Sequence, residues 1–200
     1  MRPAVPEERQ HWSRVAFDFV HGIGLKIEQV QPGELANTFI PGIRVEDGGL
    51  QVDLSAVYPG DILHEAGHLA TIPVMFRPRA RSKLLAVFRE MSEYLEAHPE
   101  GLGGWPEDPV CRAILQCGEA EATAWQYAAA HHIGLPEAWL FPEDAFGGEP
   151  NDTLYRLQTN QFLGINGLQA AGWTRVHQMG NPALPLYPEL AFWLHGGPVS

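Results

Sequence analysis

The sequence predicts an α+β fold in which a small antiparallel sheet packs on several helices. Two observations support this prediction. Apolar residues recur at intervals of three and four over several long segments, which is typical of amphipathic helices. A stretch of alternating apolar residues from Ile43 to Leu54 is interrupted by Asp47-Gly48-Gly49, which indicates a β-hairpin.

The expected elements begin and end at ordinary start and stop signals. Asp61 is a candidate N-cap of the second helix, and Pro73 is expected to close that helix. In chain order, we expect a helix over Glu7–His21, a strand over Leu25–Val30, the hairpin over Ile43–Leu54, and helices over 61–72, Ser82–Ala97, Pro109–His132 and Asp152–Phe162.

Length and composition favour one globular domain over residues 1–200. The chain is 45% hydrophobic and 18% charged, and its charges are interspersed, so it is long and apolar enough to bury a core. The net charge of −11 opposes binding to phosphate backbones and to anionic lipid surfaces. We therefore expect no nucleic acid and no membrane among the partners, and the oligomeric state stays open.

The sequence also predicts a soluble, cytoplasmic protein. The segment from Met1 to Gln10 lacks the apolar core of a signal peptide, and no stretch approaches 18 uninterrupted apolar residues. The only cysteines, Cys111 and Cys117, lie six residues apart in a predicted helix, where they point in different directions and are too far apart to pair. The absence of a disulfide framework fits a reducing compartment.

The residues that carry chemistry are His64-Glu65-Ala66-Gly67-His68, an H-E-x-x-H motif inside a predicted helix. Four residues make about one helical turn, so both imidazoles project from one face and can bind one Zn²⁺. Glu65 is then placed to take a proton from the water that attacks the substrate, as a general base. Gly67 costs about 1 kcal/mol relative to Ala in a helix, so we expect a closely packed neighbour there.

A catalytic zinc site with an open position needs a third protein ligand. A third histidine six residues after His68 is excluded because that position is Val74. The helix over Pro109–His132 offers Glu119 and Glu121, which face opposite ways. We expect Glu121 to be the ligand, with Glu119 as the alternative, because Glu121 interrupts an apolar stripe formed by Val110, Ile114, Cys117, Trp125 and Ala128.

These residues also carry a family resemblance. The His64–His68 motif, followed by Glu121-Ala122-Thr123-Ala124-Trp125 on a later helix, resembles the ImmA/IrrE-type metallopeptidases, which are small zincins of the gluzincin kind. The resemblance implies a zincin-like fold with a small antiparallel sheet before the metal helix. It also implies that His64, His68 and Glu121 bind zinc and that Glu65 is the catalytic base.

The predicted function is hydrolysis of peptide bonds in a peptide or protein substrate by a zinc-dependent metallopeptidase. Metal-assisted hydrolysis follows from the residues, whereas the peptide substrate follows from the resemblance. The alternative is a non-catalytic regulatory or protein-interaction module that keeps the same fold. Gln51, Asp53 and Ser55 are expected to border the cleft. Candidates for stabilising the oxyanion are Tyr127, His131, His132, Tyr155 and His177.

Overall fold

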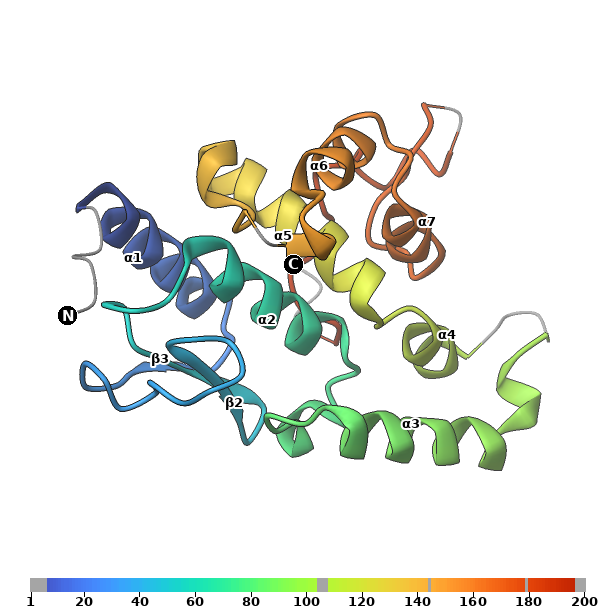
Figure 1. Cartoon of the computed structure of the whole chain (residues 1–200). Helices are drawn as coiled ribbons and strands as arrows, with labels where there is room; N and C mark the ends of the chain where they lie inside the picture. Colours follow the sequence, from blue (N-terminus) through green and yellow to red (C-terminus); the bar gives the residue numbers. More distant parts are fainter. Residues whose placement is uncertain (1–6, 104–107, 144, 179, 197–200) are drawn as a thin grey trace.

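The computed structural model describes residues 7–103, 108–143, 145–178 and 180–196, so residues 1–6 of the N-terminal segment lie outside the described residues. Within these ranges the chain is α+β, with seven α-helices and one three-stranded sheet (Figure 1). The α-helices are α1 (Glu7–Gly22), α2 (Pro59–Thr71), α3 (Leu85–Ala97), α4 (Pro109–Leu115), α5 (Glu119–Ile133), α6 (Pro150–Gln158) and α7 (Leu163–Ala170). Short 3₁₀ helices cover Arg77–Arg79, Pro99–Gly101, Glu137–Trp139 and Ala145–Gly147.

The sheet contains the predicted hairpin and one additional strand. Strands β2 (Ile43–Glu46) and β3 (Gly49–Val52) are antiparallel, and both residues of their turn, Asp47 and Gly48, have positive φ angles of 46° and 73°. Two consecutive positive φ angles are what a two-residue hairpin turn matched to the strand twist requires. The hairpin prediction is therefore confirmed.

The expectation of a purely antiparallel sheet is wrong for the first strand. Strand β1 (Ile27–Gln29) pairs in parallel with β3, so the order is β1-β3-β2 and the sheet is mixed. Strand β3 takes the centre because its Leu50 and Val52 are fully buried apolar side chains. The connection from β1 to β2 is long enough to carry the chain past β3, which leaves β2 at one edge of the sheet, where the Ser82 hydroxyl bonds the Val45 carbonyl.

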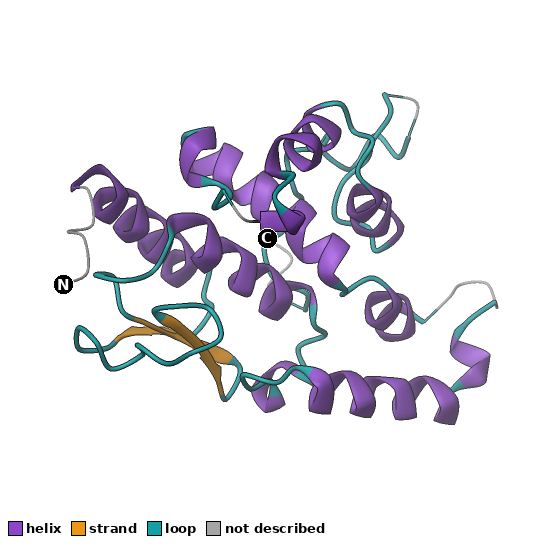
Figure 2. Ribbon diagram, viewed as in Figure 1, coloured by secondary structure: helices purple, strands orange, loops and turns teal. Residues whose placement is uncertain are grey.

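Helices α2 and α5 pack against each other at the centre of the molecule (Figure 2). Their backbones approach closely at Gly67, where a Cβ atom would lie 2.7 Å from the Ala122 carbonyl oxygen. The close neighbour expected from Gly67 is thus present. Helix α1 also packs on α2, and the sheet lies below α2 in the view of Figure 1.

The predicted helix over Pro109–His132 is in fact two helices. The chain leaves helical geometry at Gln116 (φ −124°, ψ 41°), and Gly118 is the extended N-cap of α5. Helix α2 begins at Pro59, two residues before the predicted cap Asp61, because proline needs no hydrogen-bond acceptor at the first position of a helix. Helix α7 was not predicted, since its short sequence contains two glycines.

The C-terminal end of α2 is anchored by residues distant in sequence. The half-buried Arg77 guanidinium donates to the carbonyl oxygens of Leu69 (2.7 Å) and His195 (2.8 Å), and the amide of His195 donates to the Ala70 carbonyl. Burial lowers the pKa of Arg77 to about 10. The positive charge of Arg77 lies beside the last carbonyl groups of α2, where the helix dipole favours a cation.

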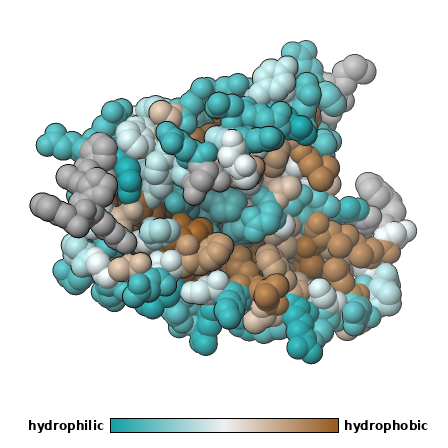
Figure 3. Space-filling model, viewed as in Figure 1, coloured by the Kyte–Doolittle hydropathy of each residue, from teal (hydrophilic) through white to brown (hydrophobic). Residues whose placement is uncertain are grey.

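Most of the surface in Figure 3 is hydrophilic, with apolar residues gathered over α3 and α4. Leu85 of α3 and Leu115 of α4 are among the exposed large apolar residues. Within the residues described, no helix is long and apolar enough to cross a membrane.

Candidate metal centre

Helix α2 places His64 and His68 on one face, as the four-residue spacing predicts. Their ring centroids lie 4.8 Å apart. The side chain of His68 is 4% exposed and that of His64 is 20% exposed, and His64 lines a cleft. The uncharged residues around them, including Leu63, Ala66 and Leu69, are fully buried and hold the helix in the core.

The first turn of α5 brings Glu119 to this pair. One carboxylate oxygen lies 3.3 Å from His64 Nε2, and the other lies 3.3 Å from His68 Nε2. The two imidazole nitrogens and the carboxylate all lie within 4.8 Å of one another, so these three side chains could hold a metal ion. Two imidazoles and one carboxylate are a donor set that zinc takes in catalytic sites, where three protein ligands leave a further position open.

A buried glutamine on α5 fixes the tautomer of His64. Gln126 Nε2 donates to the carbonyl oxygens of Gly60 and Leu140, each at 3.0 Å, so Gln126 Oε1 faces His64 Nδ1 at 3.2 Å. Because this oxygen can only accept, Nδ1 must carry the proton. The lone pair of neutral His64 is therefore on Nε2, the nitrogen that faces Glu119, which is the form needed for metal binding.

The electrostatics of the group also suit a cation. Hydrogen bonds from His64 and His68 hold the pKa of Glu119 well below its usual range, so Glu119 is a carboxylate at neutral pH. Burial lowers the pKa of His64, but the hydrogen bond to Glu119 and the charges of Glu65 and Glu119 outweigh burial and raise the pKa overall. A metal ion would take the place of the proton that these groups share.

The buried Nδ1 atom of His68 has no hydrogen-bond partner among the described residues. The two histidines therefore differ: both contact Glu119 through Nε2, but only His64 is also held through Nδ1, by Gln126.

The triad faces a cleft of about 640 Å³ that His64, Glu119 and Gln126 help to line. Glu65 is half-buried and lines a neighbouring hollow of about 300 Å³ beside the edge strand β2. Phe39 and Ile40 line both spaces, so the hollow and the cleft adjoin at this loop. Glu65 is close enough for its charge to raise the pKa of His64.

The structure does not bring Glu121, the expected third ligand, to the histidines. Its carboxylate accepts a hydrogen bond from the Gly118 amide at 3.1 Å, caps α5, and lies against Gly167 of α7. Burial raises the pKa of Glu121, although its hydrogen bonds to the backbone amides of Glu121 and Gly118 oppose this effect. The apolar stripe that favoured Glu121 assumed one continuous helix, and the break at 116–118 shifts Glu119 to the side of α5 that faces α2.

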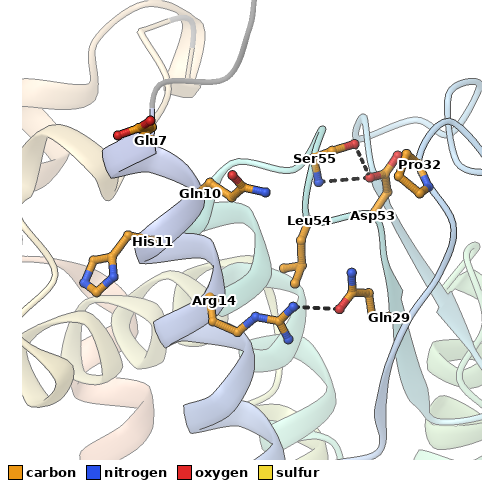
Figure 4. Close-up of a pocket in the computed structure, with 9 residues that line it drawn as sticks. All are labelled: Glu7, Gln10, His11, Arg14, Gln29, Pro32, Asp53, Leu54 and Ser55. Carbon is orange, nitrogen blue, oxygen red and sulfur yellow. Dashed lines mark hydrogen bonds between the residues drawn. The ribbon is translucent and has the colours of Figure 1, made fainter.

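The other residues proposed from the sequence lie away from the triad. Asp53 and Ser55 line a separate cavity beside α1, where Asp53 accepts hydrogen bonds from the amide and hydroxyl of Ser55 (Figure 4). None of the five oxyanion candidates is among the described residues that line the cleft. Two of these pack elsewhere, since Tyr127 stacks on Tyr187 and His132 packs on Trp193.

Gln126 is a site residue that the sequence analysis did not single out. It lies two helical turns after Glu119, so both residues project from the same side of α5. The seven-residue spacing of Glu119 and Gln126 could have identified both residues, had the polar side of α5 been predicted to face α2.

Comparisons with protein-family models, with curated proteins and with solved structures found no match to this chain.

Proposed function

We propose that this protein is a zinc-dependent hydrolase that cleaves peptide bonds, with His64, His68 and Glu119 as metal ligands. The observation that carries the proposal is the meeting of three candidate ligand atoms from two helices beside a cleft that His64 and Glu119 line. Three protein ligands with room for water are typical of catalytic zinc sites, whereas structural sites usually have four Cys or His ligands.

Each residue has a distinct role in the proposed mechanism. A bound Zn²⁺ would lower the pKa of water and polarise the substrate carbonyl. Glu65 takes the proton from the attacking water and delivers it to the leaving amine. Gln126 holds His64 in the tautomer whose Nε2 is unprotonated. Glu119 supplies the negative charge that two neutral histidines lack.

The choice of a peptide substrate rests on the resemblance to ImmA/IrrE-type metallopeptidases. The edge strand β2 lies beside Glu65, but two of its backbone groups are already engaged: the Val45 carbonyl accepts from the Ser82 hydroxyl, and the Ile43 amide donates to the Ile40 carbonyl. The proposed ligand set differs from the one implied by the resemblance only in using Glu119 instead of Glu121.

The test measures zinc content and peptide hydrolysis together, on protein purified without a histidine tag. We expect about one zinc per chain and cleavage of a mixed peptide library, as detected by mass spectrometry. Glu65→Gln should keep the zinc and lose at least about a hundredfold in rate, because only the proton transfer is removed. A chain that binds zinc but cleaves nothing would instead favour a non-catalytic interaction module.

A further inference from the structure

Two separate chain segments contribute apolar side chains to the cleft beside the triad, and we call these segments its two walls. Phe39 and Ile40 come from the segment before β2, and Phe141 and Phe146 come from the segment between α5 and α6. His64 and Glu119 line the same cleft. A group that enters between the two walls therefore reaches the candidate metal ligands.

Two of these aromatic residues are held at an energetic cost. The side chain of Phe39 is fully exposed. Phe146 has left-handed backbone angles (φ 54°, ψ 38°), which a side chain with a Cβ atom rarely adopts. The Phe146 ring stands edge-on to Phe141, with ring centroids 4.9 Å apart. The packing of the core explains neither the exposure of Phe39 nor the backbone strain at Phe146.

Apart from Asp61, the polar side chains that line this part of the cleft, Arg9 and Tyr58, bond to the protein backbone. The Tyr58 hydroxyl donates to the carbonyl oxygens of Ala138 and Phe141. The Arg9 guanidinium donates to the carbonyl oxygens of Ala56 and Val57, and it lies 5.7 Å from the centroid of the Tyr58 ring. The space between the walls therefore offers a mainly apolar, aromatic surface to a ligand.

We propose that this aromatic part of the cleft is a specificity subsite for a bulky apolar, preferably aromatic, side chain next to the scissile bond of the peptide. The inference rests on the proposed hydrolase function, because the metal triad determines where the scissile bond lies. Entry of a substrate ring between Phe39 and Phe146 removes their apolar surface from water and adds edge-to-face contacts. An alanine side chain gains little binding free energy in this way, because it is too small to contact both Phe39 and Phe146.

The test compares the binding of two acetylated and amidated alanine pentapeptides, one of which has phenylalanine at its centre. Binding is measured by calorimetry on the zinc-loaded Glu65→Gln variant, which cannot consume the peptide. We expect the phenylalanine peptide to bind about tenfold more tightly than the alanine peptide. Phe39→Ala should reduce this ratio to about threefold, because one of the two walls is lost.

The matched control is Tyr155→Ala, which removes an aromatic side chain on α6 that is 59% exposed and does not line the cleft. This control should keep the full tenfold ratio. Phe146→Gly is a second variant, because glycine tolerates the left-handed conformation. It should lower the ratio while the melting temperature is kept or raised, which separates loss of the subsite from loss of the fold.

Equal binding of the two peptides, or an unchanged ratio in Phe39→Ala, would overturn the subsite. Cleavage of the same peptides by the wild-type protein is assayed separately. If the ratio is present and cleavage is absent, the subsite stands and the hydrolase proposal fails. If both peptides are cleaved and bound equally well, the hydrolase stands and the subsite fails.

Discussion

Helices α2 and α5 hold their metal-site residues in different ways. On α2 the two histidines lie in the middle of a helix whose neighbouring residues are fully buried, and Arg77 and His195 bind its last carbonyls. On α5 the proposed ligand Glu119 is the first residue of the helix, and its side chain is 81% exposed. The core therefore positions the histidines, whereas the starting point of a helix positions the carboxylate.

This difference shows why the two kinds of ligand differ in how they can be predicted. The place of a buried residue on a helix follows from apolar periodicity, because the whole helix face must match the core. The place of a residue in the first turn depends on where the helix begins, which here is set by Gly118 and by the carboxylate of Glu121. A pair of neighbouring carboxylates thus divides into one that binds the histidines and one that caps the helix.

The strongest test of this division exchanges the two carboxylates for amides. Glu119→Gln should weaken zinc binding by about a thousandfold, since one of three ligands loses its charge. Glu121→Gln should change zinc affinity by less than about threefold, because its amide oxygen can still accept the hydrogen bond from Gly118. Competition with a chromogenic zinc chelator measures both affinities. The opposite ranking would restore Glu121 as the ligand.

A smaller loss of zinc affinity is expected when His64 loses the hydrogen bond that orients its ring. Gln126→Ala removes the acceptor for the Nδ1 proton and should weaken zinc binding by about tenfold to a hundredfold. Thr123→Val is the control, because Thr123 is equally buried on α5 but its hydroxyl bonds the Glu119 carbonyl of its own helix. The same chelator assay should show an affinity close to wild type for the control. Equal losses in both variants would point to general disruption of α5.

The contact between the two helices can be tested without touching any proposed ligand. Gly67→Ala places a methyl group against the Ala122 carbonyl and should destabilise the fold by about 1–3 kcal/mol, as overpacking does in other cores. Gly22→Ala at the end of α1 meets no atom within 4 Å and should be neutral or slightly stabilising. Urea denaturation of the two variants gives the comparison. Equal stabilities would show that the helices can separate without cost.

The parts of the fold that were predictable are those set by local signals. The first helix, the hairpin turn at Asp47-Gly48 and the helix before Pro73 were all found from caps, turns and periodicity. The parallel pairing of β1 with β3 was not predictable, because it depends on the path of residues 30–42 through space. Local signals also gave no warning that α7 packs against the start of α5.

At the site, the sequence identified both histidines and the helix that brings a carboxylate to them, but it favoured Glu121, whereas Glu119 is the residue that contacts them. The middle of α5 is buried on every side, including its polar residues Thr123 and Gln126. A helix buried all round has no single apolar stripe, so periodicity cannot tell which side faces a metal site. Only the spacing from Glu119 to Gln126 carried that information.

The contacts at the end of α2 have a consequence for protein synthesis. The carbonyl of Ala70 receives its proton donor from His195, and the indole of Trp125 on α5 donates to the carbonyl of Trp193. Both helices of the metal site are thus completed by residues translated more than sixty positions later. A chain still emerging from the ribosome lacks these contacts until about residue 195 has cleared the exit tunnel. The final geometry of the proposed metal site is therefore reached only after translation of the chain.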